Sequence, residues 1–280
     1  MTGAALLLGL IFEVSGPPRP ATPDLASAVA AAAGTKGPVW IAWEVPVANP
    51  DSHSCCYSTL DSFDRGARMT GRCVLEGDRS WTMSNGGENG NALVDPDEHR
   101  MLVVLVRMED GKVVRVRSVS EDCPVDTGSV PARLLTGVKP AESVAFLASL
   151  ARRGTGGKKE GVLAALASHA DPAAIPALID LARHDASDHV RGQSLFWLAQ
   201  RAGRKAVGAI TDAIANDPET EVKVRAVFAL SQLPKDEGVP LLIDLARRNR
   251  NPAVRKKAMF WLGQSKDPRA LAFIEEVLLK

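Results

Sequence analysis

The second half of the chain repeats a pattern of apolar and polar residues every 32 positions. Residues 190–200 (VRGQSLFWLAQ) recur at 222–232 (VKVRAVFALSQ) and at 254–264 (VRKKAMFWLGQ). A second segment, 175–183, recurs 64 positions later, at 239–247. The apolar residues of these segments return after three or four positions, which indicates amphipathic helices. Because a fixed period of this length is typical of stacked helical units, the pattern predicts an α-solenoid.

The predicted solenoid contains four helix pairs, each about 32 residues long. The pairs occupy roughly 155–186, 187–218, 219–250 and 251–280, and a single helix over 142–153 precedes and caps them. Helix starts are indicated by Asp171-Pro172, Asp217-Pro218, Asn251-Pro252 and Asp267-Pro268. Asp and Asn accept hydrogen bonds from the free N–H groups at a helix start, where Pro also fits.

The first half of the chain has the pattern of strands and loops. Short β-type runs at 39–43 and 72–75 are bounded by Gly and Pro. The clearest element is a hairpin, in which 101–107 and 113–118 are joined through Asp110-Gly111, a pair suited to a tight type I′ turn. We therefore expect an α+β chain with three parts. These parts are a signal peptide and Pro/Ala-rich linker over 1–36, a small β-rich domain over 37–135, and the solenoid over 136–280.

The repeats resemble the short HEAT-like repeats of bacterial proteins, a class found in bilin lyases. The resemblance rests on the period, the Asp-Pro dipeptides, the Val-Arg opening of the motif and its Ala-Leu-Gly-like helix ending, and it covers about half of the chain. The segment 120–126 (SEDCPVD) leading into such repeats is also similar to bacterial HEAT-repeat domain proteins. The resemblance implies HEAT-like helix pairs but no reaction. Because a stack of repeats offers an extended surface, we expect a non-catalytic scaffold that binds a protein or peptide partner.

The N-terminus indicates export. The apolar run 4–12 has the length of a signal-peptide core, and small residues at 28–30 follow it, although no Lys or Arg precedes it. The alternative is a disordered or buried N-terminal stretch. The uncharged runs 2–12 and 25–35 are shorter than the roughly 20 residues of a membrane-spanning helix. We expect an exported protein of the periplasm or cell envelope, without a transmembrane segment.

All four cysteines, Cys55, Cys56, Cys73 and Cys123, lie in the first half of the chain. In an exported domain an even number of cysteines favours disulfides, and four cysteines allow three connectivities. A bond within the vicinal pair Cys55-Cys56 closes a strained ring, so we expect each of them to bond elsewhere. The alternative function is a metal site, enzymatic or not, formed by His53, Cys55, Cys56 and a distant cysteine. The chain has no CxxC spacing that would support that site.

Two further segments carry residue types used in chemistry. One contains His184, Asp185, Asp188 and His189. It occurs in one repeat only, so a solvated loop is the better interpretation. The other, 154–159, resembles a phosphate loop, but Arg152 replaces its first glycine and Lys159 replaces its Ser/Thr. We expect no catalytic residue, no metal and no cofactor, and therefore no enzyme.

The overall charge does not favour a nucleic-acid partner. Lys and Arg number 34 against 33 Asp and Glu, for a net charge of +1. Residues 140–280 contain 21 basic and 16 acidic residues, whereas residues 1–139 contain 13 and 17. The most basic stretch, 247–257, is consistent with a nucleic-acid-binding solenoid as a lesser alternative, but export would separate the protein from DNA.

Aromatic residues are scarce, and five of the thirteen fall in two adjacent repeat columns. The helical wheel places Trp197 and Trp261 in the core, whereas Phe196 and its equivalents Phe228 and Phe260 point roughly away from that face. Two interpretations of the Phe residues stay open. They pack between repeats or against the β-rich domain, or they form an exposed apolar stripe that receives a partner.

Overall fold

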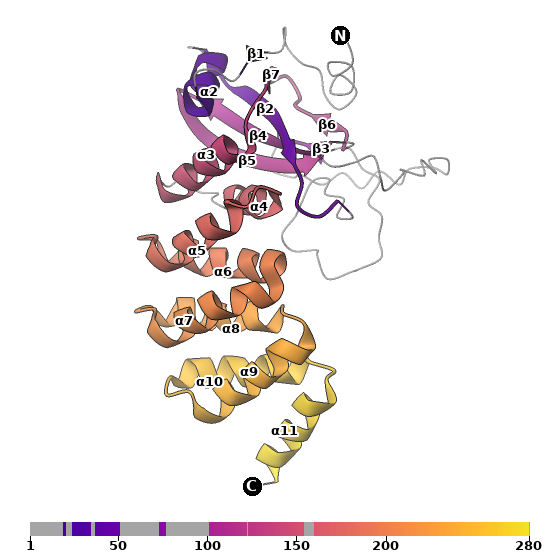
Figure 1. Ribbon diagram of the computed structural model, residues 1–280, viewed down its shortest axis with the longest axis vertical. Helices are drawn as coiled ribbons and strands as arrows, with labels where there is room; N and C mark the ends of the chain where they lie inside the picture. The colour runs from indigo at the N-terminus through magenta and orange to yellow at the C-terminus, as the bar shows by residue number, and fades with distance from the viewer. Residues whose placement is uncertain are drawn as a thin grey trace, which may run out of the picture. The chain divides into compact units, whose positions relative to one another are not determined.

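The computed structural model describes residues 19–20, 24–34, 37–50, 73–76, 101–121, 123–153 and 160–279. The chain divides into two compact units, Met1–Leu150 with Gly154–Asp171, and Ala151–Arg153 with Pro172–Lys280. The first unit contains a sheet and the second contains repeated helices (Figure 1), as expected for an α+β chain with a solenoid. The ranges 1–36, 37–135 and 136–280 stay predictions, based on where the sequence pattern changes.

Five strands form the main sheet of the first unit, in the order β1-β7-β2-β4-β5. Their bounds are Arg19–Pro20 for β1, Val39–Pro46 for β2, Met101–Glu109 for β4, Lys112–Ser120 for β5 and Ala132–Thr136 for β7. Strand β2 pairs antiparallel with β4 and parallel with β7. A second, two-stranded sheet pairs β3 (Cys73–Val74) with β6 (Val125–Asp126).

The predicted hairpin is confirmed. Strands β4 and β5 pair antiparallel, and Asp110 and Gly111 take φ values of 49° and 71° at the turn between them. Positive φ at both central residues is what a type I′ turn requires. A register shift between Arg107 and Met108 interrupts the ladder close to this turn.

The two faces of the sheet pack against different elements. On one face, Trp40 and Ala42 share a buried cluster with Cys73 and Cys123. On the other face, Arg133 of β7 donates a hydrogen bond to the carbonyl of Ala32 in α2 (Leu25–Ala33). Alternate residues of a strand point to opposite faces. The apolar run at 39–43 is therefore buried on both sides, which explains why it shows no polar alternation.

Helix α3 (Pro140–Arg153) is joined to the sheet through a chain of buried polar groups. Trp43 Nε1 donates to Ser143 Oγ at 2.8 Å, and Ser143 Oγ lies 3.0 Å from His169 Nε2. The Phe146 ring contacts Trp43 edge-on, with 5.8 Å between centroids. Burial lowers the pKa of His169 to about 4, although Asp171 acts in the opposite direction. The imidazole is therefore neutral at pH 7.

Helix α4 (Glu160–Ser168) packs closely on β5. A Cβ atom placed on Gly161 would lie 2.2 Å from the carbonyl oxygen of Val116. That oxygen belongs to the backbone of a paired strand and cannot turn away as a flexible side chain would. Glycine at 161 therefore sets how closely this helix approaches the sheet.

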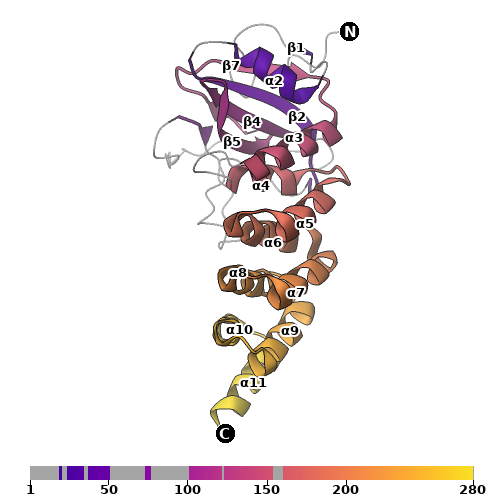
Figure 2. The same cartoon turned by 90° about the vertical axis from the view of Figure 1, so that its left-hand side faces the viewer.

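From Pro172 onward, the described residues of the second unit form seven α-helices and one short 3₁₀ turn. Their bounds are α5 Ala174–His184, α6 Asp188–Ala202, η1 Gly203–Ala206, α7 Val207–Asn216, α8 Thr220–Ser231, α9 Lys235–Arg248, α10 Pro252–Gln264 and α11 Pro268–Leu278. Figure 2 shows α5/α6, α7/α8 and α9/α10 as successive layers, with the even-numbered helices on one side and the odd-numbered helices on the other. Within the described ranges, none of the helices is both long and apolar enough to span a bilayer.

The repeat motif builds a continuous core along the even-numbered helices α6, α8 and α10. Leu198, Leu230 and Leu262 are fully buried, and so are Val190, Val222 and Val254. Each set is spaced by 32 positions. The same two positions of every motif therefore point between helices, as the helical period predicts.

Only part of the predicted capping is found. Asn251 and Asp267 are the N-caps of α10 and α11, and each accepts a hydrogen bond from a backbone N–H. Asp217 instead lies at the C-terminal end of α7, while Glu219 is the N-cap of α8. Helix α5 begins at Ala174, beyond the dipeptide at 171–172. The position of Asp217 reflects a different role, an ion pair within the solenoid.

We predict that His169 makes the stability of the protein depend on pH. The unfolded state binds a proton near pH 6.5 and the folded state only near pH 4, so stability is lost as the pH falls between these values. The free energy of unfolding should fall by about 2–3 kcal/mol between pH 7 and pH 4.5 because of this group. Urea unfolding at both pH values should show that His169→Gln loses this dependence. The exposed His184→Gln should keep it.

We predict that Gly161→Ala is destabilising by about 1–3 kcal/mol, because the added methyl group meets a backbone carbonyl and forces α4 away from β5. Thermal unfolding measures this effect. Gly208→Ala in α7 is the matched control, since a Cβ atom there has no neighbour within 4 Å among the described residues. That control should be neutral or slightly stabilising. Equal stability of the two variants would contradict the close contact.

Candidate functional site

An aromatic surface lies along the even-numbered helices of the solenoid. Phe196, Phe228 and Phe260 occupy the same motif position in α6, α8 and α10. The Phe196 and Phe228 rings lie nearly parallel, with centroids 5.6 Å apart and planes inclined by 7°. Phe228 then contacts Trp261 at 4.9 Å. The three helices therefore share one line of ring contacts.

Two further contacts extend this line at its ends. Trp197 meets Phe196 edge-on at 5.2 Å, and Phe260 meets Trp261 edge-on at 4.9 Å. We call these five residues the aromatic column. Edge-to-face and offset arrangements are the favourable ones for aromatic pairs. The column therefore stabilises the stacking of the helices as well as forming a surface.

Exposure rises along the column toward α10. Trp197 is 8% exposed, Phe196, Phe228 and Trp261 are half-buried, and Phe260 is 51% exposed. The expected core position is thus right for Trp197, whereas Trp261 keeps part of its ring at the surface. The Phe residues do not point away from the helix contacts, because Phe196 and Phe228 contact each other. Phe196 and Phe228 therefore pack between repeats, whereas an apolar stripe that receives a partner stays a prediction.

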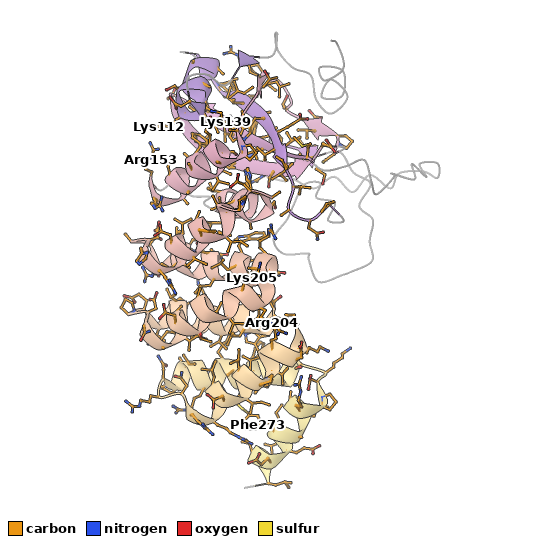
Figure 3. The ribbon with its side chains drawn as sticks, viewed as in Figure 1. Lys112, Lys139, Arg153, Arg204, Lys205 and Phe273 are labelled. Carbon is orange, nitrogen blue, oxygen red and sulfur yellow. The ribbon has the colours of Figure 1, made fainter. Side chains whose placement is uncertain are left out.

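Phe273, outside the aromatic column, is buried and not exposed at the surface. Phe273, labelled in Figure 3, lies on the odd-numbered helix α11 and is 4% exposed. The Arg247 guanidinium lies 4.9 Å above the centre of its ring. Exposed phenylalanine in the described solenoid is thus confined to the column.

A row of polar and basic side chains runs beside the aromatic column. It consists of Gln193, Arg225 and Lys257, three positions before the Phe residue of each motif. Residues three apart on a helix are surface neighbours. Lys257 Nζ lies 5.1 Å from the Phe260 ring centre and 5.3 Å from that of Trp261. The α10 end of the column therefore carries a cation against its apolar surface.

Glutamines form a second row, four positions after each Phe. Gln200 and Gln264 are exposed and Gln232 is half-buried. A glutamine side chain offers two donors and one acceptor oxygen, which matches a peptide group. Reading the motif columns for recurring polar residues, and not only for apolar ones, reveals both rows from the sequence. Neither row was predicted above, where only the aromatic positions of the motif are considered.

The even-numbered helices are more basic than the odd-numbered ones. Helices α6, α8 and α10 contain seven Lys and Arg against two acidic residues. Helices α5, α7, α9 and α11 contain five Lys and Arg against seven acidic residues. Like charges gathered on one side of a repeat stack create a field that favours partners of opposite sign. The aromatic column therefore lies on the helices that contain more basic than acidic residues.

Stacking of α6 against the next repeat is reinforced by a buried ion pair. Arg191 donates from Nε and Nη2 to the two carboxylate oxygens of Asp217, at 2.8 and 3.1 Å. Its Nη1 donates to the Asp185 carbonyl at 2.9 Å. Burial is the largest single influence and raises the pKa of Asp217. The hydrogen bonds from Arg191 and from the Glu219 backbone N–H, together with the charges of Arg191 and Lys223, outweigh burial and hold the pKa below its usual range. Arg191 and Asp217 therefore connect α6 to the C-terminal end of α7.

The ion pair is not repeated along the stack. Lys223 replaces Arg191 in the next motif, and Asn249 replaces Asp217. Lys223 Nζ donates instead to the Ala215 carbonyl at 3.0 Å. Arg255 repeats the carbonyl contact of Arg191, because its Nη1 donates to Asn249 O at 2.8 Å.

The histidine and aspartate segment between α5 and α6 forms separate local contacts. His184 pairs with Asp180 at 3.0 Å, and His189 lies 3.1 Å from Arg225. Asp185 accepts the backbone N–H of Ser187, which is the N-cap of α6. Among the described residues, no three His, Cys, Asp or Glu side chains are grouped as metal ligands. Asp185 is 8% exposed, whereas His184 and Asp188 are exposed, so the segment is only partly solvated.

Several predicted residues belong to parts outside the described ranges. His53, Cys55 and Cys56 lie there, and so does the glycine-rich segment 154–159. The metal-site alternative therefore stays untested. Cys73 and Cys123 are described, fully buried in the same cluster on one face of the sheet, and the described residues include no free cysteine.

The comparison with protein families agrees with the helical repeats. The family of HEAT repeats matches residues 207–280. This supports HEAT repeats in the region that contains Phe228, Phe260 and Trp261. No curated protein matches the chain.

We predict that Asp217→Asn lowers the free energy of unfolding by about 3 kcal/mol, because it leaves Arg191 buried without a negative charge. Asp212→Asn is the matched control. Its pair with Arg183 is 3.4 Å long and nearly half exposed, so its loss should cost under about 1 kcal/mol. Urea unfolding of both variants tests the difference. A cost for Asp217→Asn as small as that of the control would show that the pair does not hold the repeats together.

Proposed function

We propose that this protein is a non-catalytic, exported scaffold that binds a protein or peptide partner along its HEAT-like solenoid. HEAT repeats generally act as scaffolds for protein–protein interaction. The observation that carries the proposal is the aromatic column, whose Phe260 is 51% exposed while the leucines two positions after each Phe of the motif are fully buried. A large apolar group kept at the surface at a repeated position is typical of an interaction site.

The arrangement of the rings favours a protein over a nucleic acid. Bases bind to aromatic side chains by stacking on an open ring face. The faces of Phe196 and Phe228 are turned toward each other, with planes inclined by 7°. Lys257 lies against both Phe260 and Trp261. The exposed ring edges suit aliphatic and aromatic side chains of a protein partner better than they suit bases.

The proposed cellular setting is the periplasm or cell envelope of a bacterium, with repeats of the bilin-lyase type. The apolar run 4–12 supports export as a signal-peptide core. We propose that the four cysteines form disulfides there, with the pairing left open. The burial of Cys73 and Cys123, neither of which is a free thiol, supports this proposal.

Site-specific cross-linking tests the interaction surface. We predict that a photoreactive benzoylphenylalanine at position 260, in the full-length chain expressed in its native cell, yields a discrete cross-linked protein. Position 271 is the matched control, because Leu271 is 52% exposed and lies on the odd-numbered helix α11. A cross-link from 260 and not from 271 supports the proposal. The same products from both positions, or none from 260, would overturn it.

A further inference from the structure

We propose that the contacts of residues 168–170 with the end of β2 form an acid-sensitive latch, which opens when His169 is protonated while the sheet of the first unit stays folded. The latch consists of the buried chain from Trp43 through Ser143 to His169 and of two backbone hydrogen bonds beside it. It goes beyond the proposed function and does not depend on the aromatic column, which lies on other helices.

The backbone part of the latch is short. Residues 168–170 are joined to the end of β2 by one isolated β-bridge. Ala48 N donates to Ser168 O at 2.8 Å, and Ala170 N donates to Pro46 O at 2.9 Å. By contrast, β2 is paired with β4 along its whole length. Because two hydrogen bonds outside the sheet open at a lower free energy than a complete ladder, the latch can open by itself.

The hydrogen bonds of the side chains determine which imidazole nitrogen carries the proton. Trp43 Nε1 can only donate, so Ser143 Oγ accepts from it. The described contacts of Ser143 Oγ leave His169 Nε2, 3.0 Å away, as the acceptor of the hydroxyl proton. We therefore assign the proton of the neutral ring to Nδ1. That nitrogen is buried and has no hydrogen-bond partner among the described residues.

Protonation of His169 is incompatible with this arrangement. A second proton, on Nε2, would face the hydroxyl proton of Ser143. If the hydroxyl group turned away to accept from Nε2, its own proton would lose its acceptor. The closed latch would then hold a buried charge and two buried donors without partners, Nδ1 and the hydroxyl group, all of which are destabilising. Opening relieves them, because the charged ring reaches water.

The charges around His169 do not prevent this effect. Burial lowers the pKa of His169 to about 4, and the charge of Asp171 offsets it only in part. On α3, Glu142 pairs with Lys139 at 3.1 Å. On β2, burial raises the pKa of Glu44 itself. Beyond its first residue, α4 contains no charged residue. Asp171 is therefore the one charge among the described residues that favours the protonated ring in the closed latch.

The latch lies where the chain passes from the sheet unit to the solenoid. Asp171 is the last residue of the first unit, and Pro172 begins the longer segment of the second. Opening of residues 168–170 therefore gives the connecting segment more freedom in acid, although both units stay folded. The protein would thus respond to acid by a local change at this connection.

Amide hydrogen exchange of the full-length protein, measured by NMR at pH 7 and at pH 4.5, tests the latch. The closed state binds the proton near pH 4 and the open state near pH 6.5. The population of the open state should therefore rise about 50-fold between the two pH values. Ala48 and Ala170 are the reporters, because their N–H groups form the two backbone bonds. Their protection, corrected for the intrinsic exchange rate, should fall by the same factor.

Urea distinguishes the latch from unfolding of the whole unit. Low concentrations of urea should leave the exchange of Ala48 and Ala170 unchanged, because local opening exposes little surface. Val104, which is fully buried in the ladder of β2 and β4, should be more protected at both pH values and should exchange faster as urea is added. Equal protection of the three amides, with the same response to urea, would overturn the inference.

Variants connect the pH dependence to His169. His169→Gln should remove the pH dependence at Ala48 and Ala170, because a glutamine side chain does not bind a proton in this range. The exposed His184→Gln should keep it. A pH dependence that persists in His169→Gln contradicts the latch.

The tautomer of His169 is tested on the unmodified protein, so the inference stays falsifiable if His169→Gln does not fold. The nitrogen chemical shifts of the imidazole at pH 7 should show the proton on Nδ1, and the ring should stay neutral in the folded protein down to about pH 4. A proton on Nε2, or titration of the folded protein near pH 6.5, would overturn the inference.

Discussion

Packing between the even-numbered helices is the interaction on which the candidate site depends. The leucines at 198, 230 and 262 are fully buried and determine how each motif faces the next. Each Phe lies two positions before one of these leucines, and so at the edge of the same helix interface. The Phe side chains therefore meet through helix packing alone. The aromatic column is therefore a direct consequence of repeating one helical pattern at a constant period.

The ion pair between Arg191 and Asp217 limits how far the packed helices can shift relative to each other. Apolar contacts tolerate small shifts of one helix along another, whereas a guanidinium that donates to both carboxylate oxygens allows little freedom. Asp217 also accepts the backbone N–H of Glu219 at the start of α8. The Asp217 carboxylate thus connects α7 and α8, which form one layer, to α6 in the layer before it.

Much of the solenoid could be predicted from the sequence because its contacts are local and repeated. The ends of the helices were less predictable. Asp217 is followed by Pro218, as at a helix start, but its carboxylate forms an ion pair with Arg191, 26 positions away. In the sheet unit, the hairpin was predictable from Asp110-Gly111, whose turn is local. The pairing of β2 with β7, and the buried chain from Trp43 to His169, join residues far apart in sequence and left no periodic pattern.

The candidate site was only half predictable for a related reason. The spacing of Phe196, Phe228 and Phe260 was visible, but the wheel of a single helix cannot show what the neighbouring helix contributes. The contact between Phe228 and Trp261 crosses two motif columns, because a tryptophan in one repeat reaches the phenylalanine of the previous one. A helical wheel of α8 alone cannot predict this contact, because Trp261 lies on α10.

The change from Arg and Asp to Lys223 and Asn249 makes two junctions of the solenoid differ in their response to acid. Between α6 and α8 the stack is held by a rigid, bidentate charge pair, whereas between α8 and α10 a flexible amine and a neutral amide take the same positions. Among the described residues, α8 and α10 are instead joined by an aromatic contact between Phe228 and Trp261 and by a neutral hydrogen bond from Asn251 to Thr220. Protonation of carboxylates in acid can therefore break the contact that orients the first junction, whereas these contacts of the second junction do not depend on charge.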